Sequence, residues 1–111
     1  MELEQDDIDG TAVLRVSGRL DMVAAPQFKA AVEDVVAGGS PRVVVDLGAT
    51  SFIDSSGLGA VISGLRAARQ AGGDLRLAGA AGQVEQAMQL MKLDKMFGRY
   101  ATVQDAIDAG G

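Results

Sequence analysis

The feature that most constrains the fold is a short β-branched run followed closely by the pattern of an amphipathic helix. Residues 42–47 read Arg-Val-Val-Val-Asp-Leu without alternation of apolar and polar side chains, which predicts a central strand covered on both faces. Apolar residues then recur at helical spacing up to a stop at Gly72-Gly73, namely Leu58, Val61, Ile62, Leu65 and Ala68. A strand that leads into such a helix is typical of α/β proteins.

The first part of the chain shows the same two kinds of pattern. Within residues 11–17 the apolar set Ala12, Leu14 and Val16 alternates with Thr11, Arg15 and Ser17, which predicts a strand with one buried face. The acidic segment before them predicts an edge strand that turns at Asp9-Gly10, a favoured hairpin dipeptide. A helix is predicted to begin at Pro26 and to stop at Gly38-Gly39.

The last part of the chain continues the alternation of strand and helix. Residues 74–77 alternate again and predict a further strand. The helix predicted after Gly82 has Val84, Ala87, Met88 and Met91 as its apolar set, and we expect the two methionines to fill the core. Thr102 with Asp105 resembles the capping box of a short terminal helix.

Together these segments predict one α/β domain over residues 1–111. Its sheet is expected to be mixed and mostly parallel, with four to five strands and about four α-helices. A chain of 111 residues has room for one such sheet and not for two cores. Binding sites in open α/β sheets favour the loops at the carboxyl ends of the strands, so we expect function there.

The composition excludes several classes of function. The formal net charge is -5 and no basic run occurs, so direct binding of nucleic acid is not expected. The chain has no histidine and no cysteine, which removes common catalytic and metal-binding groups, and we expect no enzyme activity, cofactor or metal. The start is acidic and no apolar stretch approaches the ~20 residues that span a bilayer, which predicts a cytoplasmic protein without membrane insertion.

The segment between the central strand and the second helix carries the candidate site. Residues 51–59 read Ser-Phe-Ile-Asp-Ser-Ser-Gly-Leu-Gly, and we expect a loop there. In the simplest interpretation Asp54, Ser55 or Ser56 only caps the helix. Two adjacent hydroxyls exceed what one cap needs, and Gly57 and Gly59 would let another molecule's backbone come close. A helix N-terminus also favours a phosphate, so from the residues alone a cap and a phosphorylation site are equally supported.

Catalysis by these serines is disfavoured. A serine nucleophile needs an activating base, and without histidine only a lysine or a carboxylate remains for that role. Asp54 is too close in sequence to be a convincing base. Nucleotide binding is also disfavoured, because the chain lacks the Gly-x-x-x-x-Gly-Lys-Ser/Thr motif and a complete Gly-x-Gly-x-x-Gly.

Several segments resemble those of a known family. They are Asp-Ser-Ser-Gly-Leu-Gly at 54–59 after the strand at 43–47, Ala-Gly-Gly-Asp-Leu-Arg-Leu at 71–77, and Val-Ser-Gly-Arg-Leu-Asp at 16–21. In these segments the chain is similar to bacterial anti-sigma factor antagonists of the STAS family. The resemblance implies a STAS-type domain in which an anti-sigma factor with serine kinase activity phosphorylates Ser55, with Ser56 as the second choice.

The resemblance also implies a partner-switching mechanism. The unphosphorylated protein would bind the anti-sigma factor and release a sigma factor, phosphorylation would stop the binding, and a phosphatase would restore it. Asp21, Asp54, Ser56, Gly57 and Leu58 are the predicted partner-binding residues.

Bland alternatives remain open for three of these residues. Asp21 is equally consistent with a contact to the kinase and with a turn or cap residue. Capping is favoured for Asp54 and core packing for Leu58. The family often has an acid where Arg19 stands, which bears on the choice of partner. A second functional interpretation is a STAS regulatory subunit of an ABC-type lipid transporter or of a stress-signalling complex.

Overall fold

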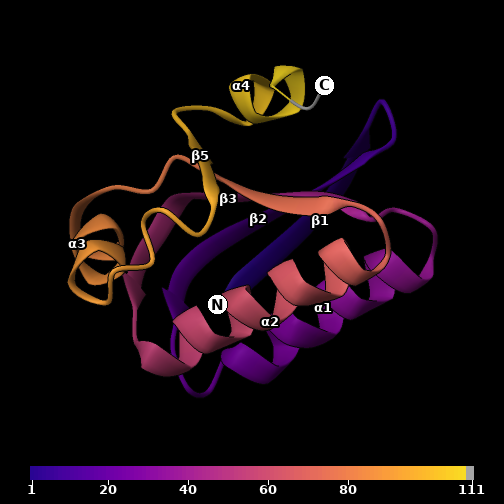
Figure 1. The fold of residues 1–111 in the computed structure, drawn as a ribbon. Coiled ribbons are helices and arrows are strands. Elements are labelled where there is room, and N and C mark those ends of the chain that lie inside the picture. Colours follow the sequence, from indigo (N-terminus) through magenta and orange to yellow (C-terminus); the bar gives the residue numbers. More distant parts are fainter. Residues whose placement is uncertain (110–111) are drawn as a thin grey trace.

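The computed structural model describes residues 1–109, so the last two residues of the predicted domain lie outside the described part (Figure 1). The elements in chain order are β1 (Glu2–Ile8), β2 (Thr11–Leu20), α1 (Ala25–Ala37), β3 (Arg42–Ile53), α2 (Ser55–Gln70), β4 (Asp74–Ala78), α3 (Gly82–Leu90), β5 (Gly98–Tyr100) and α4 (Val103–Asp108). The pattern-based predictions located all of these except β5. That strand has three residues, too few to show a period.

The strands form one mixed sheet in the order β1-β2-β3-β4-β5. β1 is antiparallel to β2, and the pairs β2–β3, β3–β4 and β4–β5 are parallel. The β1–β2 hairpin turns at Asp9 and Gly10, which have φ angles of 53° and 85°. Two positive φ angles suit the right-handed twist of a hairpin and explain the Asp-Gly pair. The predicted fold class is therefore confirmed.

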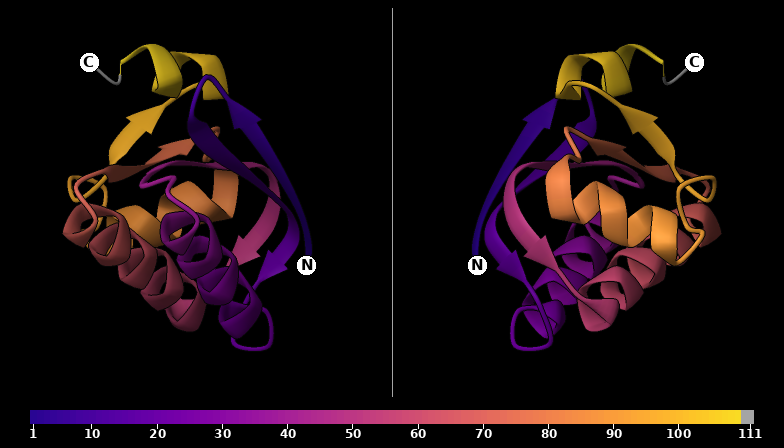
Figure 2. Two further views of the ribbon diagram at one scale, coloured as in Figure 1. Left: turned by 90° about the vertical axis from the view of Figure 1, so that its right-hand side faces the viewer. Right: turned by 90° about the vertical axis from the view of Figure 1, so that its left-hand side faces the viewer.

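Helices cover both faces of the sheet, but to different extents (Figure 2). α1 and α2 lie side by side against one face, and α3 packs in the same layer against β3. The main core forms between this layer and the sheet, whereas α4 covers the other face over a smaller cluster of Val13, Val44, Ala78 and Ala106. β3 is the middle strand, with Val43 and Val45 in the main core and Val44 in the smaller cluster. The prediction of a central strand buried on both faces is confirmed.

The prediction that the strand at residues 11–17 has a single buried face is wrong for its first half. Ala12, Leu14 and Val16 lie in the main core as expected, but Val13 is also fully buried, because it lies in the smaller cluster with Ala106 of α4 on the other face. The helix is tied to the sheet by Arg76, whose Nη1 donates to the carbonyl of Ala106 at 3.0 Å. A short terminal helix can therefore help to bury the second face of a strand whose sequence pattern predicts only one buried face.

Two further predictions need correction. Residues 51–53 belong to β3 and are not a loop, because β3 stays paired with β2 as far as Ile53 even though its pairing with β4 stops at Asp46. Met88 fills the core as expected, but Met91 is 48% exposed, because α3 ends at Leu90 and Met91 is only its C-cap. Over residues 1–109, no helix combines the length and apolar character that crossing a bilayer would need.

Candidate functional site

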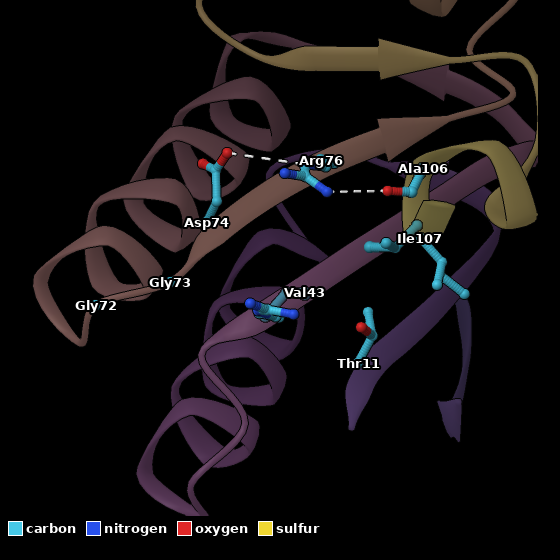
Figure 3. Close-up of a pocket in the computed structure, with 10 residues that line it drawn as sticks. Thr11, Val43, Gly72, Gly73, Asp74, Arg76, Ala106 and Ile107 are labelled. Carbon is cyan, nitrogen blue, oxygen red and sulfur yellow. Dashed lines mark hydrogen bonds and ion pairs between the residues drawn. The ribbon is translucent and has the colours of Figure 1, made fainter. Parts of the chain in front are cut away.

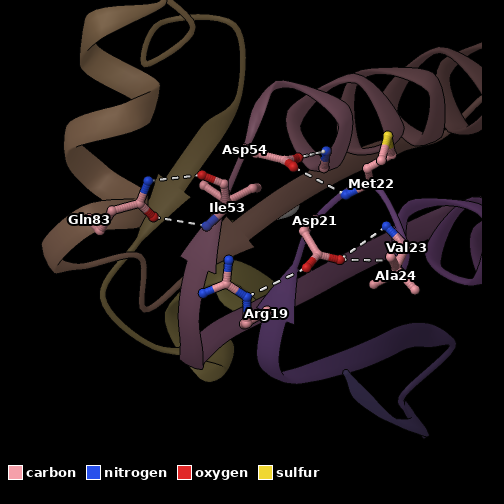
Figure 4. Close-up of polar contacts among 9 residues, drawn as sticks. Arg19, Asp21, Met22, Val23, Ala24, Ile53, Asp54 and Gln83 are labelled. Carbon is pink, nitrogen blue, oxygen red and sulfur yellow. Dashed lines mark hydrogen bonds and ion pairs between the residues drawn. The ribbon is translucent and has the colours of Figure 1, made fainter.

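Two connections meet at the carboxyl ends of the parallel strands β2 and β3 (Figure 4). One runs from β2 to α1 through residues 21–24, and the other is the single residue Asp54 between β3 and α2. The backbone N–H of Asp54 donates to the carbonyl of Leu20 at 3.4 Å, so the two connections are in direct contact. This is the edge at which open α/β sheets carry their binding sites.

Asp54 joins the two connections through both carboxylate oxygens. Its Oδ1 accepts a hydrogen bond from the backbone N–H of Gly57 at 2.8 Å and so caps α2. Its Oδ2 accepts from the backbone N–H of Met22 at 3.1 Å. The capping role predicted for Asp54 is confirmed, and the bond to Met22 adds a tie across 32 positions that no local pattern indicates.

Asp21 organises the β2–α1 connection. Its Oδ1 accepts from the backbone N–H groups of Val23 and Ala24 at 3.1 and 3.2 Å, and its Oδ2 lies 3.5 Å from Nε of Arg19. The hydrogen bond from Ala24 is the largest influence and lowers the pKa of Asp21. Burial is next in size and raises it, whereas the bond from Val23 and the bond and charge of Arg19 lower it further, so the pKa is lowered on balance. The turn role considered for Asp21 is observed, and 26% of its side chain remains exposed.

The end of β3 is held from two sides. The guanidinium of Arg19 lies over the ring of Phe52, 4.2 Å from its centroid, in a cation–π contact. The side chain of Gln83 in α3 accepts from the backbone N–H of Ile53 at 2.8 Å and donates to its carbonyl at 2.9 Å. Gln83 thereby satisfies backbone groups that β4 does not reach. The sequence reasoning missed Gln83, because one glutamine in the first turn of a helix forms no pattern.

The two serines differ in their surroundings. Ser55 is the first residue of α2 and is exposed, whereas Ser56 is half-buried in a groove beside α1. Neither hydroxyl has a hydrogen-bond partner among residues 1–109, and Asp54 supplies the cap in their place. The hydroxyls are therefore free of a structural task.

The glycines of the first turn of α2 have opposite roles. A Cβ on Gly57 would overlap the carbonyl oxygen of Leu20 and lie 2.9 Å from Cγ1 of Ile53, whereas a Cβ on Gly59 would meet nothing within 4 Å. The prediction that Gly57 leaves room for another molecule is therefore wrong, because the end of β2 takes that room. Leu58 is 2% exposed and fills the core, the role favoured for it. Gly57 and Leu58 thus present no side-chain surface to a partner.

Two exposed apolar side chains next to this site were not predicted. Met22 is 70% exposed and Val23 is 84% exposed in the β2–α1 connection. Their backbone N–H groups are bonded to Asp54 and Asp21, which hold this connection in place. A pair of apolar residues in a loop has no period, so the sequence pattern did not single them out.

A second hollow lies at the opposite edge of the sheet, where β3 and β4 begin beneath α4 (Figure 3). Arg76, one of its polar lining residues, is bonded to the carbonyl of Ala106 and lies 3.9 Å from the carboxylate of Asp74. These contacts attach α4 to the sheet, so the hollow has a structural explanation. In the described part of the chain, no three acidic side chains gather as a metal site would require.

Comparisons with known proteins show the family of this chain. Residues 2–106 match the STAS domain model. The chain is 32% identical over 103 residues to the anti-sigma-F factor antagonist RsfB of Mycobacterium tuberculosis, covering 91% of this chain and 82% of that protein. The crystal structure of an anti-sigma factor antagonist from Mycobacterium paratuberculosis matches with a TM-score of 0.88 at 33% identity, covering 98% of this chain and 92% of that one. SpoIIAA of Bacillus in its phosphorylated form matches with a TM-score of 0.76 at 25% identity, covering 97% and 98%. The chain therefore belongs to the STAS domain family.

Proposed function

We propose that this chain is an anti-sigma factor antagonist and that phosphorylation of Ser55 switches its binding off. The observation that carries the proposal is the exposed, unbonded hydroxyl of Ser55 at the first position of a helix capped by another residue. Relatives support it: RsfB, at 32% identity, is named an antagonist of the anti-sigma-F factor, and SpoIIAA, at 25% identity, has a phosphorylated form.

The domain can accept a phosphate at Ser55 without refolding. Asp54 already bonds the N–H of Gly57, while the N–H groups of Ser55 and Ser56 have no acceptor among residues 1–109. Free N–H groups and the positive end of the helix dipole favour an anion at this position. The phosphorylated state is therefore compatible with the fold.

The partner would not accept the same phosphate. A phosphoserine carries about -1.5 to -2 charges, and burying that charge in a packed interface costs affinity unless the partner supplies cations. Asp21 lies in the adjoining connection, where its carboxylate is already paired with Arg19 and bonded to backbone N–H groups. Asp21, Asp54 and Ser56 form the polar part of the proposed partner surface, while Gly57 and Leu58 support it from beneath.

Ser55 is the better phosphate acceptor because a kinase can reach it. It is exposed, whereas Ser56 lines the groove beside α1 and is half-buried. The proposed partners are an anti-sigma factor with serine kinase activity and a phosphatase that restores the unmodified form. In this proposal the chain acts by binding and by accepting phosphate, since both carboxylate oxygens of Asp54 are already bonded to N–H groups and leave no ready base beside Ser55.

The site of phosphorylation is tested by incubating the protein with the kinase and ATP and locating the phosphate by mass spectrometry. We expect Ser55→Ala to abolish the label, and Ser56→Ala and the exposed control Ser51→Ala to keep it. Label that persists on Ser55→Ala and disappears from Ser56→Ala would assign the site to Ser56 instead.

The switch itself is tested by calorimetric titration of the anti-sigma factor without ATP. We expect Ser55→Asp to bind at least tenfold more weakly than wild type and Ser55→Ala to bind almost normally. Wild-type affinity retained by both Ser55→Asp and the enzymatically phosphorylated protein would refute the charge switch. No binding by the unmodified wild-type protein would refute the proposed function.

A further inference from the structure

A groove lies between the start of α1 and the start of α2, next to the proposed phosphorylation site. Met22, Ala25 and Lys29 line one wall, and Ser56, Gly59 and Ser63 line the other. We call this the α1–α2 groove. Ser56 belongs both to the groove and to the serine pair, so the groove is continuous with the proposed partner surface.

Two apolar side chains beside the groove, Met22 and Val23, are largely exposed to solvent and do not contribute to the core. Met22 is 70% exposed, although its backbone N–H is fixed by Asp54, so its position is held while its side chain stays in solvent. Val23 beside it is 84% exposed, and the half-buried Ala25 lines the groove itself, whereas Ala60 behind it is only 6% exposed. Positioned apolar side chains next to a concave surface are suited to receive an apolar side chain of another protein.

Lys29 gives the groove a charge preference. The nearby carboxylates of Asp21 and Asp54 are engaged with backbone N–H groups. No carboxylate of residues 1–109 forms an ion pair with Lys29, including Glu33 one helical turn further along α1. A cation left without an internal partner in a chain of net charge -5 favours a carboxylate supplied from outside.

We infer that the α1–α2 groove receives an acidic, amphipathic segment of the anti-sigma factor, with an apolar side chain between the two helices and a carboxylate paired with Lys29. This inference rests on the proposed function and adds the chemistry by which the partner is selected. The groove thereby supplies affinity and partner choice, and Ser55 beside it supplies the switch.

Gly59 offers a direct test, because no atom of the protein occupies the position of a Cβ on this residue. A Cβ at position 59 would meet no atom within 4 Å, and Gly59 lines the groove. Replacing this helix-interior glycine also removes a residue of poor helix propensity. We therefore expect Gly59→Leu to fold at least as stably as wild type in thermal unfolding, and to bind the anti-sigma factor at least tenfold more weakly in calorimetric titration.

Lys29→Glu tests the charge preference independently. We expect about a tenfold loss of affinity and a weaker dependence of affinity on salt concentration, because an attractive pair becomes a repulsive one. Arg42→Glu is the matched control: it makes the same charge change on an exposed residue at the start of β3, the opposite end of the strand from the site. The control should bind within about twofold of wild type.

The outcomes separate this inference from the proposed function. If Ser55→Asp loses binding while Gly59→Leu and Lys29→Glu both bind like wild type, the groove inference is overturned and the switch stands. If Gly59→Leu is poorly folded, Lys29→Glu against Arg42→Glu decides the matter, and equal affinities of those two variants overturn the inference. If unmodified wild type does not bind, the proposed function fails and the inference fails with it.

Discussion

α1 and α2 begin at the same edge of the sheet, but their first turns are held in different ways. α2 starts directly after β3, with the side chain of Asp54 as its cap and Gly57 pressed against the end of β2. α1 starts after a four-residue connection, and its N-cap Ala24 makes no side-chain cap bond; Asp21 holds the preceding N–H groups instead. The difference shows how one edge of the sheet presents the Ser55 hydroxyl on a firmly held helix start, next to the exposed side chains of Met22 and Val23 on a longer connection.

The largest effect is expected from disturbing the close contact between Gly57 in α2 and the end of β2. Gly57→Ala places a methyl group onto the carbonyl of Leu20, which belongs to the backbone and cannot move aside cheaply. We expect a loss of about 3 kcal/mol in the free energy of unfolding, at the upper end of the cost of overpacking. Urea unfolding followed by circular dichroism measures it. A variant as stable as wild type would show that Gly57 and Leu20 are not in tight contact in solution.

Removing the cap should have the next largest effect. Asp54→Ala loses the bond to the N–H of Gly57 and the bond to the N–H of Met22. We expect a destabilisation of about 2 kcal/mol, from about 1 kcal/mol for the cap and about 1 kcal/mol for the second bond. Asp54→Asn is the control, since an amide oxygen still accepts one of the two bonds, and it should lie between wild type and Asp54→Ala. Equal stability of all three proteins would contradict the proposed tie between the connections.

On the open side of α2, adding a side chain should increase the stability of the protein. Gly59→Ala adds a methyl group where no atom lies within 4 Å and removes conformational freedom from the unfolded chain. We expect stabilisation by about 0.5 to 1 kcal/mol in the same unfolding measurement. A loss of stability would mean that the space above Gly59 is needed by the fold and would weaken the case for the groove.

The smallest effect is expected at Asp21 and depends on pH. Its pKa is lowered in the folded protein, so its charge stabilises the fold at pH values above the ordinary pKa of an aspartate. That contribution is lost as the pH falls through the lower folded-state pKa. Asp21→Asn keeps an acceptor oxygen without the charge, so we expect it to be slightly less stable than wild type at neutral pH and equally stable in strong acid. Unfolding curves over the acidic range measure this, and a constant difference at every pH would exclude the charge as the cause.

Long patterned segments could be predicted and short or cross-chain contacts could not. The apolar face of α2 and the β-branched core of β3 repeat over enough residues to identify their structure. Residues 51–53 could not be predicted as strand, because they are held there by pairing with β2 and by hydrogen bonds from Gln83. Both contacts come from residues far away in the sequence. The site followed the same division: Asp54 was predictable as a cap, whereas its bond to Met22 was not.

By itself, the order of residues determined the α/β class, the hairpin at Asp9-Gly10 and the position of two serines at the start of a helix. These depend on local periods and turn chemistry, which act over a few neighbouring residues. Only the tertiary structure decided that Gly57 is closed by β2, that Gly59 is open, and that Met22 and Lys29 stand beside Ser56. Those relations join segments more than 20 positions apart, and only packing of the helices on the sheet brings them together.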